Sequence, residues 1–210
     1  MYLNRTLFRA FAFAAALSAP LGSFAAITVV NSAGAFNVLV GTRGVDGFDD
    51  LVTEGLSSVS ANRTAAPFAY TAAAANGLYF FPGLLSTAAS ADSLVLSNFS
   101  AGVYGFAANF SAQNFFGAPS AGQLSFKYNG SAIGAPVNVP TGTGFVGFVF
   151  DAPIVGEITV TSNVLDFGDV YLAVDNLTIA SAVPELGTFP LIVAGAGALF
   201  AATLRRRRVG

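Results

Sequence analysis

The chain has 210 residues with a formal net charge of −2 at pH 7, and it contains no cysteine, no histidine and no tryptophan. The missing cysteines exclude a disulfide scaffold and thiol chemistry, and the missing histidines exclude a Ser-His-Asp triad and histidine-ligated metals. Between residues 26 and 181 only Arg43, Arg63 and Lys127 are basic, against ten acidic residues. Because such an acidic domain repels phosphate backbones, we expect no nucleic-acid partner.

The first 25 residues have the pattern of a secretory signal peptide. Arg5 and Arg9 form a positive n-region, residues 10–17 form an uncharged apolar h-region, and Ser23 and Ala25 place small residues at positions −3 and −1. We therefore expect export through the Sec translocon and cleavage after Ala25. An N-terminal membrane anchor is the alternative, and the shortness of the apolar run disfavours it.

Residues 26–181 predict one all-β domain. Short apolar segments alternate with Gly, Pro, Asn and Ser, and no segment keeps a helical period over a long stretch. Strands are predicted at 27–30, 36–40, 78–81, 93–97, 103–110, 123–128, 136–139, 145–150, 157–161 and 170–179. Their number and spacing favour an antiparallel β-sandwich, jelly-roll-like.

Local motifs refine this prediction. Asn129-Gly130 is the pattern of a two-residue hairpin turn and leads into a short strand-like segment. The alanine-rich stretch 61–76 contains Pro67 and is predicted to be a loop. The segment 142–147 matches G-x-G-x-x-G but leads into a strand pattern, which argues against dinucleotide binding. The triplet 166–168, Asp-Phe-Gly, is predicted to be a turn.

The chain contains 21 phenylalanines, and we expect most of them to fill the core of the sandwich. The alternative is that a few of them, among Phe80, Phe81, Phe115 and Phe116, stack against sugars on an exposed face. Carbohydrate sites more often use Trp and Tyr, so the absence of tryptophan disfavours this alternative.

Acidic residues cluster near both ends of the domain: Asp46, Asp49 and Asp50 in the first cluster, and Asp166, Asp169 and Asp175 in the second. Hard cations such as calcium bind several carboxylate and carbonyl oxygens. The alternative is that these aspartates lie in solvated turns.

The segment 171–177, Tyr-Leu-Ala-Val-Asp-Asn-Leu, is similar to the last strand of jelly-roll carbohydrate-binding modules. In that family the corresponding aspartate commonly helps to hold a structural calcium beside the first strands. The resemblance therefore implies calcium as a possible bound ion, with Asp50 and Asp175 among its ligands.

The last part of the chain, 182–210, has three consecutive parts. A short turn-like motif occupies 183–188, an uncharged apolar run follows at 189–204, and Arg205, Arg206, Arg207 and Arg208 come next. A helix over the run would be about 24 Å long, close to the ~30 Å of a bilayer core. The arginines are expected to stop translocation and to stay in the cytoplasm. A buried C-terminal helix is the alternative.

With Val183, Pro184 and Glu185 before the run and four arginines after it, the tail resembles a PEP-CTERM sorting signal. Leu186 stands where that signal has its second proline. The resemblance implies processing by an exosortase in a Gram-negative bacterium. It also implies an intermediate anchored in the inner membrane, followed by release to the cell surface or an extracellular matrix.

The leading functional expectation is a non-enzymatic surface or matrix protein with a structural or adhesive role linked to exopolysaccharide or biofilm. The second is a calcium-stabilised glycan-binding module. The third is a glycosidase or lyase, which would need a facing carboxylate pair. Because nothing in the sequence singles out two of the ten carboxylates, we expect no enzyme activity.

Overall fold

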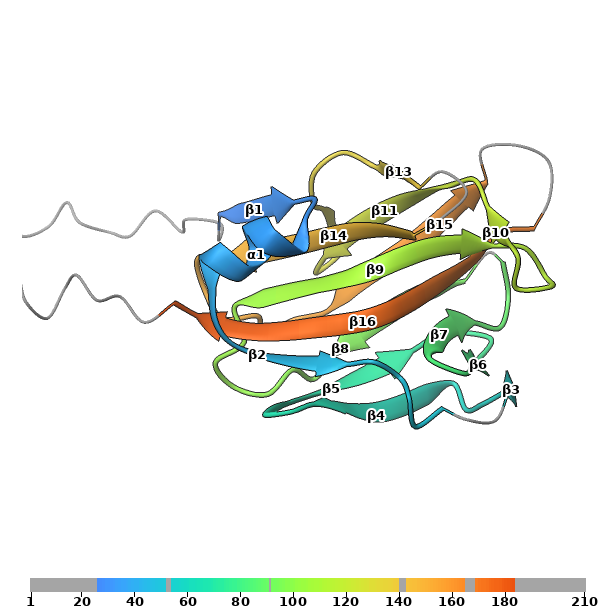
Figure 1. Ribbon diagram of the computed structural model, residues 1–210, viewed down its shortest axis with the longest axis horizontal. Helices are drawn as coiled ribbons and strands as arrows, with labels where there is room; N and C mark the ends of the chain where they lie inside the picture. Colours follow the sequence, from blue (N-terminus) through green and yellow to red (C-terminus); the bar gives the residue numbers. More distant parts are fainter. Residues whose placement is uncertain (1–25, 52–53, 91, 140–142, 165–168, 184–210) are drawn as a thin grey trace, which may run out of the picture.

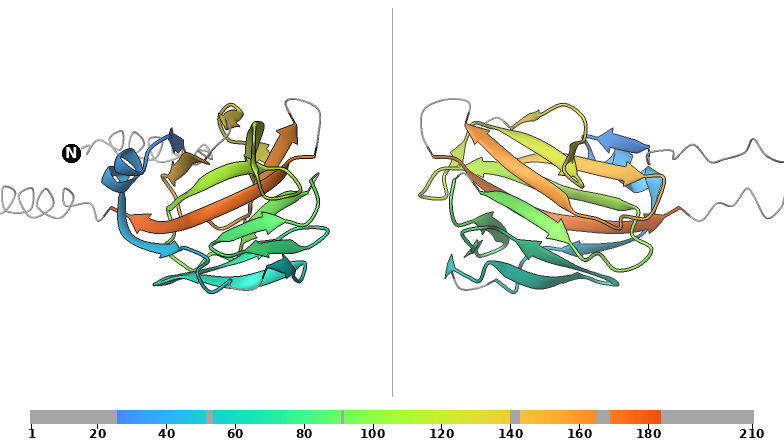
Figure 2. Two further views of the ribbon diagram at one scale, coloured as in Figure 1. Left: turned by 45° about the vertical axis from the view of Figure 1, so that its right-hand side comes forward. Right: turned by 180° about the vertical axis from the view of Figure 1, so that it is seen from behind.

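Two antiparallel β-sheets pack face to face in the computed structural model, which describes residues 26–51, 54–90, 92–139, 143–164 and 169–183 (Figure 1). Figure 2 shows both layers in an oblique view and from behind. The predicted antiparallel all-β sandwich is therefore confirmed. The chain passes repeatedly from one sheet to the other, as it does in jelly rolls.

The first sheet has nine strands: β1 (Ile27–Val30), β2 (Val40–Asp46), β3 (Gly55–Leu56), β6 (Leu78–Phe81), β7 (Leu84–Thr87), β9 (Gly105–Gln113), β10 (Pro119–Ser120), β14 (Thr143–Phe150) and β16 (Tyr171–Ala182). The second has seven: β4 (Ser60–Ala65), β5 (Phe68–Ala73), β8 (Ser93–Ser97), β11 (Gly122–Tyr128), β12 (Ser131–Ala132), β13 (Val137–Val139) and β15 (Ile158–Val164). One short helix, α1 (Ala33–Leu39), lies on the first sheet.

Strand β16 is central to the nine-stranded sheet. It pairs with β9 along one side, and along its other side it pairs first with β7 and then with β2. A register shift between Asp175 and Thr178 accompanies the change of partner. Twelve residues long, β16 runs from one end of the sandwich to the other (Figure 1).

Phenylalanine rings from both sheets meet in the main core. Phe106, Phe110 and Phe148 come from the nine-stranded sheet, and Phe126 of the other sheet lies 4.9 Å from Phe148 and 5.2 Å from Phe110 between ring centroids. All four rings are buried, and each contributes ~1.5–3 kcal/mol by leaving water. The expectation that phenylalanines fill the core holds for these four residues.

A second, smaller core lies on the outer face of the nine-stranded sheet, beneath α1. Ser32 caps this helix because its hydroxyl accepts a hydrogen bond from the amide of Ala35. The ring of Phe36 then packs on Gly105 and Gly147, where an added Cβ would come within 3.1 Å and 2.9 Å of it. The prediction of a strand at 36–40 is therefore wrong, because the cap and this docking site favour a helix.

The prediction of a loop at 61–76 is also wrong, because β4 and β5 form a hairpin there. Pro67 lies in the turn between them, after a cis peptide bond with Ala66, where no ladder hydrogen bond is lost. The predicted strands at 27–30, 78–81 and 93–97 are confirmed with their bounds. The other predicted strands overlap β9, β11, β13, β14, β15 and β16, whereas β2, β3, β7 and β10 were not predicted.

Two of the motif predictions are confirmed. Asn129 and Gly130 form the turn between β11 and β12, with φ angles of 48° and 78°. The five residues of the G-x-G-x-x-G segment that the structure describes, 143–147, lie within β14, so the segment enters a strand and not a helix. The Asp-Phe-Gly triplet 166–168 lies outside the described residues.

The first residue of β1 and the last residue of β16 lie at the same end of the sandwich (Figure 1). The amide of Asp151, after β14, donates to the carbonyl of Ala26, and Ala182 pairs with Val40. In the part of the chain that the structure describes, no helix has the length and hydrophobicity to cross a membrane. The predicted signal peptide with Ala25 and the predicted span at 189–204 lie outside that part.

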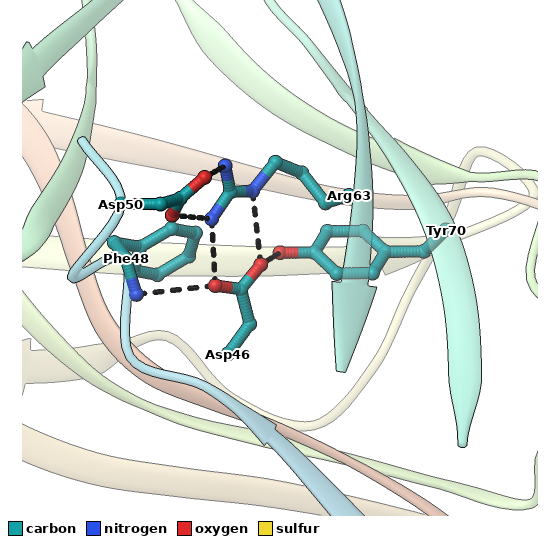
Figure 3. A network of polar contacts seen from close by, with 5 residues as sticks. All are labelled: Asp46, Phe48, Asp50, Arg63 and Tyr70. Carbon is teal, nitrogen blue, oxygen red and sulfur yellow. Dashed lines mark hydrogen bonds and ion pairs between the residues drawn. The ribbon is translucent and has the colours of Figure 1, made fainter. Parts of the chain in front are cut away.

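A buried ion pair links the two sheets next to β2 (Figure 3). The Arg63 guanidinium, on β4, donates to both carboxylate oxygens of Asp46 at 2.9 and 2.7 Å, and to both oxygens of Asp50 at 2.8 and 2.7 Å. Asp46 also accepts from the Tyr70 hydroxyl at 2.8 Å and from the Phe48 amide at 3.1 Å. The Phe48 ring lies 5.2 Å from the guanidinium carbon.

The two ion pairs differ in exposure. The side chains of Arg63 and Asp46 are 9% and 5% exposed, whereas that of Asp50 is 67% exposed. Removing one partner of a buried pair leaves a charge without compensation, whereas an exposed pair contributes little. Burial, together with the negative charge of Asp46, raises the pKa of the Tyr70 hydroxyl far above its usual range.

We expect Asp46→Asn to lower the free energy of unfolding by about 3–5 kcal/mol, because Arg63 would lose its buried counter-charge. Asp50→Asn removes a partner of the same guanidinium but at an exposed position, so we expect a loss of at most about 1 kcal/mol. Urea unfolding at pH 7 measures both losses. Equal losses would contradict the assignment of Asp46 as the structural partner.

The pH dependence of stability above pH 10 tests Tyr70. In the unfolded chain its phenol ionises near pH ~10, but the folded protein keeps it protonated, so unfolding releases a proton at higher pH. The contribution of Tyr70 to the free energy of unfolding is therefore complete below pH ~10. Above that pH it is lost, by up to about 1.4 kcal/mol per pH unit. We expect Tyr70→Phe to unfold with a shallower alkaline slope than the wild type. Tyr104→Phe, outside the network, is the control, and parallel slopes for Tyr70→Phe and wild type would refute this explanation.

Candidate functional site

A pocket of about 330 Å³ opens on the nine-stranded sheet, at the end of the sandwich where β16 begins. Its volume is at the lower limit of the ~300–1,000 Å³ of small-molecule sites. We call it the aromatic pocket, because five of its residues are aromatic. It is lined by Glu54, Tyr79, Phe81, Ser86, Thr87, Ala88, Gln113, Asn114, Phe115, Phe116 and Tyr171.

The strand register brings these residues together from distant parts of the chain. Tyr171, the first residue of β16, is paired with Gln113, the last residue of β9. Ser86 on β7 is paired with Ala173 of β16 on one side and with Tyr79 of β6 on the other. Since residues two apart share a face of a strand, Tyr79 and Phe81 project on the same side of β6.

The same outer face of the sheet has two different halves. Along β9, Ala107 packs in the small core beneath α1, and Gln113, six residues on, lines the aromatic pocket. The even-numbered residues between them, such as Phe110 and Ala112, belong to the main core. The helix therefore covers one half of the face, and the aromatic pocket lies on the other half.

A tight turn after β9 carries the most exposed aromatic side chains of the pocket. The Asn114 side chain holds this turn because its Oδ1 accepts from the amides of Phe116 and Ala118, both at 3.0 Å. Gly117 has φ 74°, and a Cβ placed there would be 3.4 Å from the Phe81 ring. The turn thus presents Phe115 and Phe116, which are 73% and 87% exposed.

The aromatic rings form two groups. Phe115 lies 5.6 Å from Phe116 and 6.2 Å from Tyr171 between centroids, with steep interplanar angles of 83° and 59°. Tyr79 and Phe81 form the other group, with centroids 4.8 Å apart. Rings inclined in this way present both faces and edges to a ligand, and exposed faces are attractive to C–H groups and cations.

Polar groups stand beside the rings. The Tyr79 hydroxyl donates to Glu54 Oε1 at 3.2 Å, and partial desolvation together with the negative Glu54 raises the pKa of this hydroxyl. Ser86 Oγ donates to the carbonyl of Leu172 at 2.7 Å, so its hydrogen already has a partner.

Gln113 has an unpaired polar atom. Its side chain is only 7% exposed, and its Oε1 is buried without a hydrogen-bond donor among the described residues. An unsatisfied buried amide oxygen costs about 1–3 kcal/mol. A residue that lines a pocket at such a cost is a candidate for ligand recognition.

The pocket does not contain the carboxylate pair that a glycosidase needs. Among the described lining residues Glu54 is the only carboxylate, and the two-carboxylate mechanism needs a second one about 5–9.5 Å away. The arrangement is suited to binding, and the expectation that the chain is not an enzyme stays a prediction.

The two predicted calcium ligands, Asp50 and Asp175, accept hydrogen bonds from different partners. Both oxygens of Asp50 accept from Arg63, which lowers the pKa of the Asp50 carboxyl. Asp175, on β16, accepts from the Asn176 side chain, and burial raises the pKa of its carboxyl, with a further rise from the nearby Asp49. No cluster of three or more acidic side chains suited to a metal is found among the described residues. Calcium binding by Asp50 and Asp175 stays a prediction.

The predicted sorting residues fall almost entirely outside the described part of the chain. Val183, its last residue, is exposed after the end of β16. Pro184, Glu185 and the arginine cluster 205–208 lie beyond it. Asp166 lies in the gap at 165–168, which is also outside the described residues. Of the four phenylalanines predicted as sugar-stacking candidates, the structure places Phe81, Phe115 and Phe116 in the pocket, whereas Phe80 packs against the main core.

Sequence reasoning missed Tyr79, Tyr171 and Gln113, because only the strand register brings them to the turn at 114–117. A signal for that turn was present: two adjacent aromatic residues between Asn114 and Gly117 cannot both face the core of a strand.

No family model matches the chain, and no curated protein matches it. Among the solved structures that are similar to it are two with low sequence identity and a low TM-score. One is the GH26-CBM35 β-(1,4)-mannanase of Podospora anserina, with 18% identity and a TM-score of 0.29 over 69% of this chain and 29% of that one. The other is the CBM36-1 domain of a multidomain xylanase from the hindgut metagenome of Trinervitermes trinervoides, with 20% identity and a TM-score of 0.25 over 68% of this chain and 98% of that one.

This chain thus spans about 29% of the length of the mannanase. At TM-scores this low the likeness carries no statement about function. What the aromatic pocket can bind is decided by its own residues.

Proposed function

We propose that this domain is a glycan-binding module that acts outside the cell and that the aromatic pocket is its binding site. The observation that carries the proposal is the combination of exposed aromatic rings with a buried amide oxygen that has no donor among the described residues, in one pocket. Aromatic walls with a few placed polar groups are the usual composition of a small-molecule site.

A sugar ring matches both parts of this pocket. Its faces carry C–H groups, which pack on aromatic faces, while its edges carry hydroxyls, which donate and accept hydrogen bonds. Phe115, Phe116 and Tyr171 offer the aromatic surface. Glu54 offers carboxylate oxygens, and a ligand hydroxyl that reached Gln113 Oε1 would remove the cost of its missing donor.

The position of the pocket suits a protein held by its chain end. From Tyr171 at the pocket to Ala182 near the last described residue, β16 spans about 35 Å at ~3.3 Å per residue. A tether at the C-terminal end would thus leave the pocket at the far end of β16 from the point of attachment. This geometry supports a role in holding exopolysaccharide at a cell surface or in a matrix.

We further propose that the C-terminal tail directs this placement as a PEP-CTERM signal recognised by an exosortase. The support is the order of motif, apolar run and arginine cluster in the sequence. The chain would then pass through an inner-membrane-anchored intermediate before release.

Phe116→Ala tests the pocket. Loss of one stacking ring is worth about 0.5–1.5 kcal/mol, so we expect up to about tenfold weaker binding of the best ligand from a glycan array, measured by titration calorimetry. Because Phe116 is exposed, the midpoint of urea unfolding should not change. Val155→Ala, at an equally exposed apolar residue near the opposite end of the sandwich, is the matched control and should bind as the wild type does.

Gln113→Met adds a second readout to this test. It replaces an unpaired amide by an apolar side chain of similar shape, so we expect stability to be kept or raised by about 1 kcal/mol while binding weakens. A stable variant with undiminished affinity would remove Gln113 from the site. No binding by the wild type to any glycan would overturn the proposed function.

Intact mass measurement and cell fractionation test the tail. In cells with a functional exosortase we expect a mature species that begins after Ala25 and ends near Glu185–Thr188, outside the inner membrane. In cells without the exosortase we expect the full tail, retained in the membrane. A mass that includes 189–210 in both strains would show that the signal is inactive and that the protein stays anchored.

A further inference from the structure

The charges around the aromatic pocket have one sign. Glu54 is the only charged residue among its described lining residues. The three basic residues of the domain all lie elsewhere: Arg63 is bound in the ion-pair network, Arg43 donates to the carbonyl of Asn37 near α1, and Lys127 is on the second sheet. Among the described residues, no basic side chain is therefore placed to attract an acidic sugar to the aromatic pocket.

The aromatic rings add to this negative potential. The face of a Phe or Tyr ring carries partial negative charge, and an ammonium group placed over such a face is attracted to it. Tyr79 and Phe81 lie on one strand, and Phe115 and Phe116 lie in the turn that touches Phe81. A cation in the pocket would thus be close to several rings as well as to a carboxylate.

The Glu54 carboxylate can accept further hydrogen bonds from a cationic ligand. Its Oε1 accepts one hydrogen bond from Tyr79, and a carboxylate has about four acceptor positions. Glu54 is exposed at the rim, so a ligand can reach it without displacing protein groups. Desolvation raises the pKa of the Tyr79 hydroxyl, and the negative charge of Glu54 raises it further.

We infer that the preferred ligand is an amino-sugar chain with free, protonated amines, whose ammonium group binds between Glu54 and the aromatic rings. This inference rests on the proposed glycan-binding function and specifies its ligand class. Uronate chains are disfavoured because their carboxylates would face Glu54 without a compensating cation. Fully N-acetylated chains offer the same sugar faces but no charge.

Three oligosaccharides of equal length and the same β-1,4 linkage test the inference: glucosamine, N-acetylglucosamine and glucose chains. Titration calorimetry is done at low salt and at a pH where the amine is protonated. We expect the glucosamine chain to bind about tenfold more tightly than the other two. The preference should shrink in high salt, which screens charges at a rim position.

Glu54→Gln should reduce the preference for the glucosamine chain to about twofold or less, because that chain loses its charged partner. Glu157→Gln is the matched control, because it removes the same charge from an exposed glutamate that lies in another depression, beside Val155. That control should keep the full preference. A preference unchanged in Glu54→Gln, or equal binding of all three chains by the wild type, would overturn the inference but leave the glycan-binding function standing.

Tetramethylammonium distinguishes an amino sugar from a simple cation. We expect it to bind far more weakly than the glucosamine chain, because it has no sugar face to stack and no hydroxyl for Gln113. Binding as tight as that of the chain would overturn the inference by showing that the pocket recognises ammonium alone. If none of the three chains binds the wild type, the glycan-binding function itself fails, which is a different result.

Discussion

The arrangement of the two sheets depends on one guanidinium group. Arg63 comes from the seven-stranded sheet, and its partner Asp46 ends strand β2 of the nine-stranded sheet. Asp46 receives donors from Arg63, Tyr70 and Phe48, so both of its buried oxygens are satisfied. A buried charge is tolerated only when it is paired and hydrogen-bonded in this way, and the pairing therefore specifies how the edges of the sheets meet.

Strand β16 connects this framework to the site. Its C-terminal half pairs with β2, whose last residue is Asp46, and its N-terminal half pairs with β7, beside the aromatic pocket. The change of partner occurs at the irregularity between Asp175 and Thr178. One strand thus links the last described residues, the ion-pair network and the pocket, so that the position of the pocket relative to a C-terminal tether is set by the sheet.

The division of the outer sheet face explains why a pocket exists. Beneath α1 the strands carry Gly105, Ala107 and Gly147, and their small size lets the Phe36 ring lie directly on the backbone. Beyond the helix the same face carries Tyr171, Gln113 and Ser86, which line the aromatic pocket together with Phe115 and Phe116 of the turn after β9. The Gln113 Oε1 atom, buried there without a donor among the described residues, is consistent with a site that is completed by its ligand.

The sequence alone determined the strand-rich character, the acidic charge and the hairpin at Asn129-Gly130, because these follow from local alternation, composition and turn chemistry. It also identified Phe81, Phe115 and Phe116 as possible stacking residues. It did not predict α1, since the stability of this short helix depends on two glycines more than 60 residues away, or the β4–β5 hairpin, since Pro67 disfavours a strand but suits a turn. Only the tertiary structure decided that Tyr79, Gln113 and Tyr171 share one pocket, because strand register is set by long-range pairing and not by local sequence.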